Sequence, residues 1–77
     1  MKTKVLLFGI LADVAGQSII EIDKVPDTDT LLNKVREINP FFSHLKFATA
    51  VNKRIVLSNQ FLDENDEVAL LPPFSGG

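Results

Sequence analysis

The residues best suited to chemistry stand at the carboxyl end of this sequence, which closes with Gly76-Gly77. Glycine makes up roughly 7% of average proteins, so two glycines fill the last two positions by chance in about 0.5% of chains. Because glycine has no Cβ, this pair can enter a narrow cleft that any other residue would block. We therefore interpret the Gly77 carboxylate as a reactive group. Transfer of AMP onto it creates a good leaving group, and an external persulfide can displace AMP to leave a thiocarboxylate.

The residues before the glycines predict how this group is presented. Pro72 and Pro73 have no backbone N–H, so they end the last strand and favour a stiff, extended stem. We expect a folded domain over residues 1–71 and a flexible C-terminal tail over residues 72–77. The tail residues expected to contact a partner are Pro72, Pro73, Phe74, Ser75 and Gly76. Phe74 is the expected anchor, because one buried aromatic side chain can dominate an interface.

Composition limits what the rest of the chain can do. The 77 residues are 45% hydrophobic and 23% charged, which favours one small globular domain over an enzyme with a deep cleft. The net charge of -2 provides no basic surface for nucleic acid. No apolar run approaches the ~18 residues of a membrane span. We expect a cytoplasmic protein that binds neither nucleic acid nor membrane.

The side chains also offer little sulfur or metal chemistry of their own. The chain has no cysteine, which excludes disulfides, thiolate zinc sites and Cys-ligated iron–sulfur clusters. No internal thiol can compete for an activated acyl group. His44 is the single histidine and has no clustered ligands, and the acidic turn over residues 63–67 lacks the spacing of an EF-hand. We predict no metal site and no cofactor bound by this chain.

The first part of the sequence predicts two strands joined by a short helical turn. Residues 2–8 pass from polar alternation into the apolar run Leu6-Leu7-Phe8, which suggests a central strand buried on both faces. Residues 10–16 carry apolar side chains at helical spacing and end at a glycine. Residues 18–23 predict the second strand, with Ile20 and Ile22 on one face.

One longer helix follows. Thr28 is the expected N-cap, and Asn39-Pro40 is expected to end the helix. Its apolar stripe is predicted to consist of Leu31, Leu32, Val35 and Ile38. The pair Phe41-Phe42 that comes next is expected in the core rather than at an interface.

The remaining residues predict a second hairpin and a final strand. Strands over residues 47–51 and 54–57 are joined by Asn52-Lys53, a two-residue turn in which Asn tolerates positive φ. Residues 67–71 predict the last strand, which the prolines end. The order is hairpin, helix, hairpin, strand, with the first and last strands at the centre. This predicts an α+β fold of the ubiquitin-like β-grasp kind, a mixed sheet of about five strands with one main helix packed across it.

The stretch Asp66-Glu67-Val68-Ala69-Leu70-Leu71-Pro72-Pro73-Phe74-Ser75-Gly76-Gly77 resembles the ending of molybdopterin synthase small, sulfur-carrier subunits, a ubiquitin-like β-grasp family. Val5-Leu6-Leu7-Phe8 and Ala50-Val51-Asn52 add to the likeness, which covers nearly the whole chain. The two prolines are its most specific part, because related thiamin-pathway carriers usually lack them. The chain departs from the pattern at Ala12, where a basic residue is frequent, and at Phe74, where a smaller aliphatic residue is common.

The resemblance implies a set of partners. A ubiquitin-activating-like adenylyltransferase would use ATP to adenylate Gly77, and a persulfide donor would convert the end to a thiocarboxylate. The tail would then insert into the large synthase subunit, where sulfur passes to cyclic pyranopterin monophosphate in molybdenum cofactor biosynthesis. The family assembles as a heterotetramer of two small and two large subunits.

The residues alone leave three other functions open. Gly77 could form isopeptide bonds with lysines, as in a ubiquitin-like protein modifier. The carrier could serve the thiamin pathway or another biosynthetic route. The domain could also be a β-grasp interaction module with an inert tail.

Overall fold

The computed structural model describes residues 2–72, so residues 1 and 73–77 lie outside the described range. In chain order the elements are β1 (Lys2–Leu7), α1 (Ile10–Ala15), β2 (Ile19–Asp23), α2 (Thr28–Ile38), the 3-10 helix η1 (Pro40–His44), β3 (Ala48–Val51), β4 (Arg54–Val56) and β5 (Val68–Leu71). The predicted succession of hairpin, helix, hairpin and final strand is confirmed.

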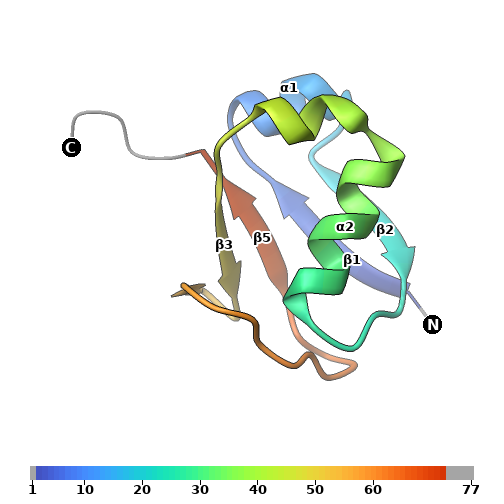
Figure 1. Cartoon of the computed structure of the whole chain (residues 1–77), viewed down its shortest axis with the longest axis vertical. Helices are drawn as coiled ribbons and strands as arrows, with labels where there is room; N and C mark the ends of the chain where they lie inside the picture. Colours follow the sequence, from blue (N-terminus) through green and yellow to red (C-terminus); the bar gives the residue numbers. More distant parts are fainter. Residues whose placement is uncertain (1, 73–77) are drawn as a thin grey trace.

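The five strands form one mixed sheet in the order β2-β1-β5-β3-β4. The last strand therefore lies in the middle, parallel to β1 and antiparallel to β3 (Figure 1). Val5 stands opposite Val68 in the parallel pair, and Thr49 stands opposite Leu70 in the antiparallel one. This topology confirms the predicted α+β fold and the central placement of the first and last strands.

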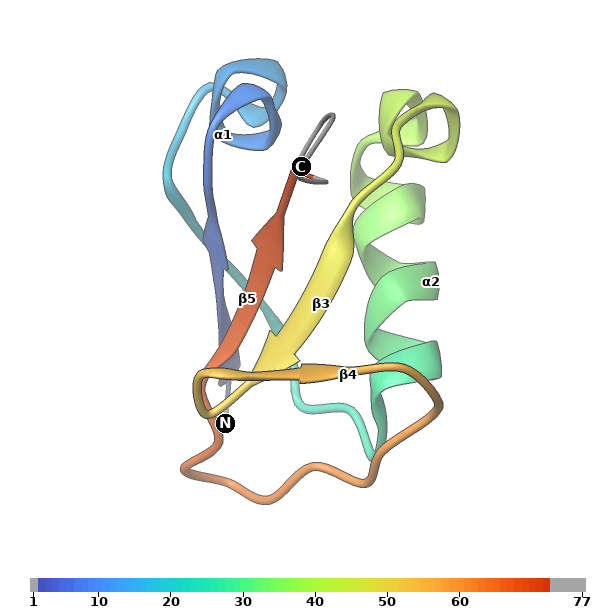
Figure 2. The same cartoon turned by 90° about the vertical axis from the view of Figure 1, so that its left-hand side faces the viewer.

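The core lies between one face of the sheet and α2, which crosses that face (Figures 1 and 2). Leu31 and Val35 are the helix side chains that α2 buries most completely. The alternate strand residues that meet them are also almost inaccessible to solvent; they are Val5, Leu7, Ile20, Ile22, Val68 and Leu70. Packing of one apolar helix stripe on one apolar sheet face is what holds β5 in place.

The opposite face of the sheet is open, which corrects one prediction. The run Leu6-Leu7-Phe8 suggested a strand buried on both faces, but only Leu7 of the three is buried. Leu6 is half-buried, and Phe8 is 45% exposed. The helices cover only one face of β1. The apolar side chains on its other face, which alternate with the core residues, therefore remain in contact with solvent.

The start of α2 differs by one residue from the prediction. Asp27, not Thr28, is the N-cap: its carboxylate accepts a 2.9 Å hydrogen bond from the N–H of Thr30. Thr28 is buried, and its hydroxyl is engaged with the loop after β4, accepting a 2.9 Å bond from the N–H of Gln60. Asn59 adds bonds to the same helix end, so the loop is fastened to α2.

The end of α2 confirms one prediction and contradicts another. The helix stops at Asn39, which caps η1 with its side chain. Ile38 was expected in the apolar stripe but is 60% exposed, because it borders an open groove between α2 and β2 instead of the core. Phe42 is buried in the core, whereas Phe41 is 53% exposed, so the expectation for this pair is correct only for Phe42.

Candidate functional site

The chain leaves the sheet at the end of β5, beside the junction of β1 and α1. The parallel strands β1 and β5 both end at this edge of the sheet, where α1 begins (Figure 2). The N–H of Phe8 donates a 3.2 Å hydrogen bond to the carbonyl oxygen of Leu70, which continues the pairing past the end of β1. Pro72, the last described residue, is half-buried with its ring against Gly9. The point from which the tail begins is therefore held by the body of the domain.

The other end of β5 is held by Asn52, the first residue of the β3–β4 turn. Asn52 has φ 51 and Lys53 has φ 70, which confirms the predicted two-residue turn. The Asn52 side chain accepts a 2.9 Å bond from the N–H of Glu67 and donates a 2.8 Å bond to Asp66. The Asp66 carboxylate also accepts a 2.8 Å bond from the N–H of Asp63. These bonds, first that from Asp63 and then that from Asn52, lower the pKa of Asp66.

A shallow apolar groove of about 410 Å³ lies on the open face of the sheet, leading to the chain exit. We call it the open-face groove. Its apolar lining comes from the four strands β1, β3, β4 and β5 and from the residue after β1, namely Leu6, Phe8, Ala50, Ile55, Ala69 and Leu71. Lys53 and Glu67 also line it and bring one charge of each sign.

Strand alternation explains why this groove forms. Val68 and Leu70 point into the core, so Ala69 and Leu71 must point to the opposite face. Ile55 on β4 is 49% exposed on the same side, and no helix covers it there. Exposed apolar side chains gathered around a concave surface are typical of a site that binds another protein. Leu71 belongs to both the groove and the exit, so one partner can contact both at once.

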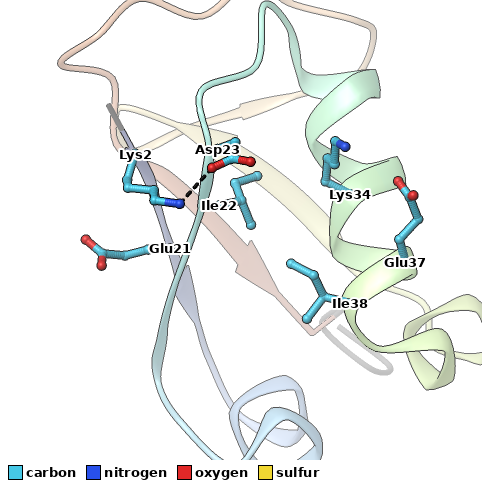
Figure 3. A pocket seen from close by; sticks show the side chains of 7 residues that line it. All are labelled: Lys2, Glu21, Ile22, Asp23, Lys34, Glu37 and Ile38. Atoms are coloured by element: carbon cyan, nitrogen blue, oxygen red, sulfur yellow. Dashed lines mark hydrogen bonds and ion pairs between the residues drawn. The ribbon is translucent and has the colours of Figure 1, made fainter.

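A second groove, of about 350 Å³, lies between β2 and α2 (Figure 3). Lys2 donates a 2.7 Å hydrogen bond to Asp23, and this ion pair raises the pKa of Lys2 and lowers that of Asp23. Both side chains are largely exposed. The other lining residues are Glu21, Ile22, Lys34, Glu37 and Ile38. This groove is lined by charges of both signs, unlike the mainly apolar open-face groove. It borders β2, which β1 separates from β5 in the sheet.

The part of the chain that the structure describes offers no group of three or more His, Asp and Glu side chains that could hold a metal ion. None of the helices in this part of the chain is long and apolar enough to cross a membrane.

Of the predicted site residues, Pro72 alone lies within the described range. It follows β5 directly, as expected of a residue that ends the strand. Pro73, Phe74, Ser75, Gly76 and Gly77 lie outside the described residues. The roles of all six in activation or partner binding stay predictions.

Sequence reasoning missed the open-face groove. Its signal was present in two places: the apolar residues Leu6 and Phe8, which alternate with Leu7, and the pair Ala69 and Leu71, which alternate with Leu70. Taken together with a single long helix, which can cover only one face of a sheet, these patterns imply exposed apolar residues on the other face.

Comparison with known proteins identifies relatives across the whole chain. The protein-family model described as "ThiS family" matches residues 5–77. A curated protein of Dictyostelium discoideum, named molybdopterin synthase sulfur carrier subunit, is 32% identical over 81 residues. That alignment covers 96% of this chain and 94% of the relative.

Solved structures agree on the fold. A chain in the complex of subunits 1 and 2 of molybdopterin-converting factor from Helicobacter pylori is 28% identical, with a TM-score of 0.74 and complete coverage of both chains. SAMP1 from Haloferax volcanii has a TM-score of 0.80 at 24% identity, again with complete coverage of both chains. At that identity the likeness to SAMP1 shows the fold alone, and it confirms the predicted ubiquitin-like β-grasp.

Proposed function

This chain belongs to the ThiS family, and on that premise we propose that it is the small, sulfur-carrier subunit of a molybdopterin synthase. The observation that carries the proposal is the exit of the chain from the central strand. β5 ends at Leu71, at the edge of an apolar groove, and the sequence continues to Gly76-Gly77. The 32% identity to a relative with that name, over nearly the full length of both chains, supports this choice.

The chemistry begins at the Gly77 carboxylate. The carboxylate attacks the α-phosphorus of ATP, pyrophosphate leaves, and a mixed acyl–AMP anhydride remains. A persulfide then attacks the carbonyl carbon, and AMP departs with the bridging oxygen. A thiol cleaves the resulting S–S bond, being oxidised to a disulfide, and leaves a thiocarboxylate on Gly77. The chain has no cysteine, so no thiol of its own diverts the acyl group.

The tail residues have distinct tasks in this proposal. Gly76 keeps the end narrow enough to enter a cleft, since it has no side chain. Phe74 anchors the tail in the partner, and Pro72, Pro73 and Ser75 set its course. Because proline has a restricted φ, the two prolines reduce the conformational freedom that binding would otherwise remove.

Two partners take part. The first is the large synthase subunit, which receives the tail and passes its sulfur to cyclic pyranopterin monophosphate. The Helicobacter pylori relative, solved as a complex of two subunits, supports a partner of this kind. The second is an adenylyltransferase of the ubiquitin-activating type, which binds the ATP. We place the open-face groove against the large subunit, with two copies of each subunit in the assembly.

The proposal is tested by loading the full chain with sulfur. The protein is incubated with ATP, an adenylyltransferase and a persulfide donor, and its intact mass is measured. We expect a gain that corresponds to the exchange of one oxygen atom for sulfur, and none in a chain lacking Gly77. The loaded protein is then mixed with the large subunit and cyclic pyranopterin monophosphate, which should yield the dithiolene.

The same experiment separates the alternatives. Loading without transfer to cyclic pyranopterin monophosphate, but with transfer to a thiamin precursor, would identify a thiamin-type carrier. Conjugates of higher mass in cell extract, joined through Gly77 to lysines, would identify a protein modifier. Full function after removal of Gly76 and Gly77 would identify the chain as an interaction module with an inert tail.

A further inference from the structure

An unusual contact lies at the junction of β1 and α1. Gly9 has φ 58 and ψ -134, a conformation open to glycine but strained for any residue with an L side chain. A Cβ built on Gly9 would lie 3.0 Å from Cγ of Pro72 and 3.6 Å from Cδ. The first distance is closer than ordinary van der Waals contact allows. The missing side chain of Gly9 thus leaves the space that the Pro72 ring occupies.

The residues before Pro72 restrict its position further. Leu70 accepts the 3.2 Å bond from the N–H of Phe8, the residue that precedes Gly9. Leu71 is paired with Ala48 on β3. Pro72 itself has its φ restricted by the pyrrolidine ring. The position of Pro72 is therefore restricted in two ways. The two residues before it are bound to the end of β1 and to β3, and its own ring restricts its φ.

We propose that Gly9 is a positioning residue for the tail. The ring of Pro72 packs against the Cα of Gly9, and this contact sets the direction in which the chain continues after β5. The inference rests on the proposed function, in which one partner receives Gly77 while it contacts the open-face groove. Both contacts form together only if the tail starts in the right direction. An error at Pro72 is passed on to Pro73, whose φ is also restricted, and so changes where the tail starts relative to the groove.

Gly16 shows that Gly9 does more than permit a turn. Gly16 caps the other end of α1 with φ 77, so it too has a backbone conformation that favours glycine. A Cβ on Gly16 would meet nothing within 4 Å. The two glycines bound the same helix and share a positive φ, but Gly9 alone lies against the chain exit. Gly16→Ala is therefore the matched control for Gly9→Ala.

The test uses the full chain and the large synthase subunit from the same organism. Four variants are compared with the unaltered protein: Gly9→Ala, Gly16→Ala, Pro72→Ala and the double variant Gly9→Ala/Pro72→Ala. Calorimetric titration gives the Kd for the large subunit, and thermal unfolding gives the stability of each variant. Both glycine variants should lower the melting temperature, because each forces a side chain into a positive φ.

The expected results separate positioning from stability. Gly9→Ala should weaken binding about tenfold through misplacement of the tail. Gly16→Ala should change the Kd by less than about twofold, since distant sites act independently. In the Pro72→Ala background, where the ring is gone, Gly9→Ala should have almost no further effect on the Kd. Equal losses in the two glycine variants, or an undiminished effect of Gly9→Ala without Pro72, would overturn the inference.

A structural readout keeps this inference apart from the proposed function. In the unaltered protein, NMR should show a nuclear Overhauser effect between the Hα protons of Gly9 and the ring protons of Pro72. Its absence would overturn the inference, whatever the binding data show. A protein that shows this effect and yet does not bind the large subunit would overturn the proposed function. The positioning role of the Gly9–Pro72 contact would then be overturned as well.

Discussion

The side-chain amide of Asn52 donates a 2.8 Å hydrogen bond to the carboxylate of Asp66, across a gap of fourteen positions in the sequence. This bond joins two of the three segments that resemble sulfur carriers. Ala50-Val51-Asn52 ends β3 and begins its turn, and Asp66-Glu67-Val68 leads into β5. The two segments lie together in the structure, where they fix the start of the central strand that ends at the exit.

Loss of the Asn52 side chain should destabilise the fold. Asn52→Gly keeps the positive φ available but removes both side-chain hydrogen bonds, so we expect a loss of about 1.5 kcal/mol in the free energy of unfolding. Urea unfolding measures it. Lys53→Gly is the control, because it also places glycine at a positive φ and should leave the stability unchanged or higher. Equal losses in the two variants would show that the bonds contribute nothing.

Stability should depend on pH through the capping carboxylate of Asp27. Hydrogen bonding by Thr30, from its side chain and its backbone N–H, lowers the pKa of Asp27, with a smaller effect from Asn59. Because the pKa of Asp27 is lower in the folded state than in the unfolded state, ionised Asp27 stabilises the fold at pH values above its unfolded-state pKa, which is about 4. This stabilisation is lost as the pH falls through the folded-state pKa. Asp27→Asn, which keeps a capping oxygen, should lose less stability between about pH 7 and pH 2. An unchanged pH profile would contradict the capping role.

The open-face groove should carry binding energy without contributing to the core. Ile55→Asp places a charge in the groove, and we expect the Kd for the large subunit to rise tenfold or more, roughly the effect of losing a central interface residue. Ile38→Asp is the control, because Ile38 is also an exposed isoleucine but lies in the groove between β2 and α2. Calorimetric titration of both variants, with circular dichroism to verify folding, decides the matter. A similar loss in both would show that the groove is not the docking surface.

Substitution at Gly76 should separate activation from folding. Within residues 2–72, the last member of the hydrophobic core is Leu70, and Gly76 belongs to the predicted tail, so we expect Gly76→Ala to leave the melting temperature unchanged. The added methyl group should crowd the cleft that receives the tail and slow adenylation. The rate of pyrophosphate release with the adenylyltransferase measures this step. Activity equal to that of the unaltered protein would show that the cleft tolerates a side chain.

Extension of the chain past Gly77 should abolish sulfur loading. An added residue converts the terminal carboxylate into an amide, which cannot attack ATP. Intact-mass measurement should then show no exchange of oxygen for sulfur. Proteolytic removal of the extra residues should restore loading, and loading without that removal would mean that Gly77 is not the reactive position.

Much of the local structure was predictable, because it depends on neighbouring residues. Alternation in residues 18–23 indicated β2, Asn39-Pro40 marked the end of α2, and Asn52-Lys53 identified the hairpin turn. The N-cap was harder, since Asp27 and Thr28 both have suitable side chains. What decides between them is Gln60, a residue distant in the chain, which engages the Thr28 hydroxyl and leaves the capping position to Asp27.

The sequence by itself determined the order of the elements through the patterns of a β-grasp, and its closing Gly76-Gly77 and lack of cysteine predict where the chemistry takes place. Only the tertiary structure decided which apolar residues stay exposed and which distant residues meet. Leu6 and Leu7 are equally apolar, yet a helix covers one and leaves the other on the open face. Gly9 has no local reason to meet Pro72. Parallel pairing of the first and last strands brings them together, because burial of the whole core, rather than any local preference, sets that pairing.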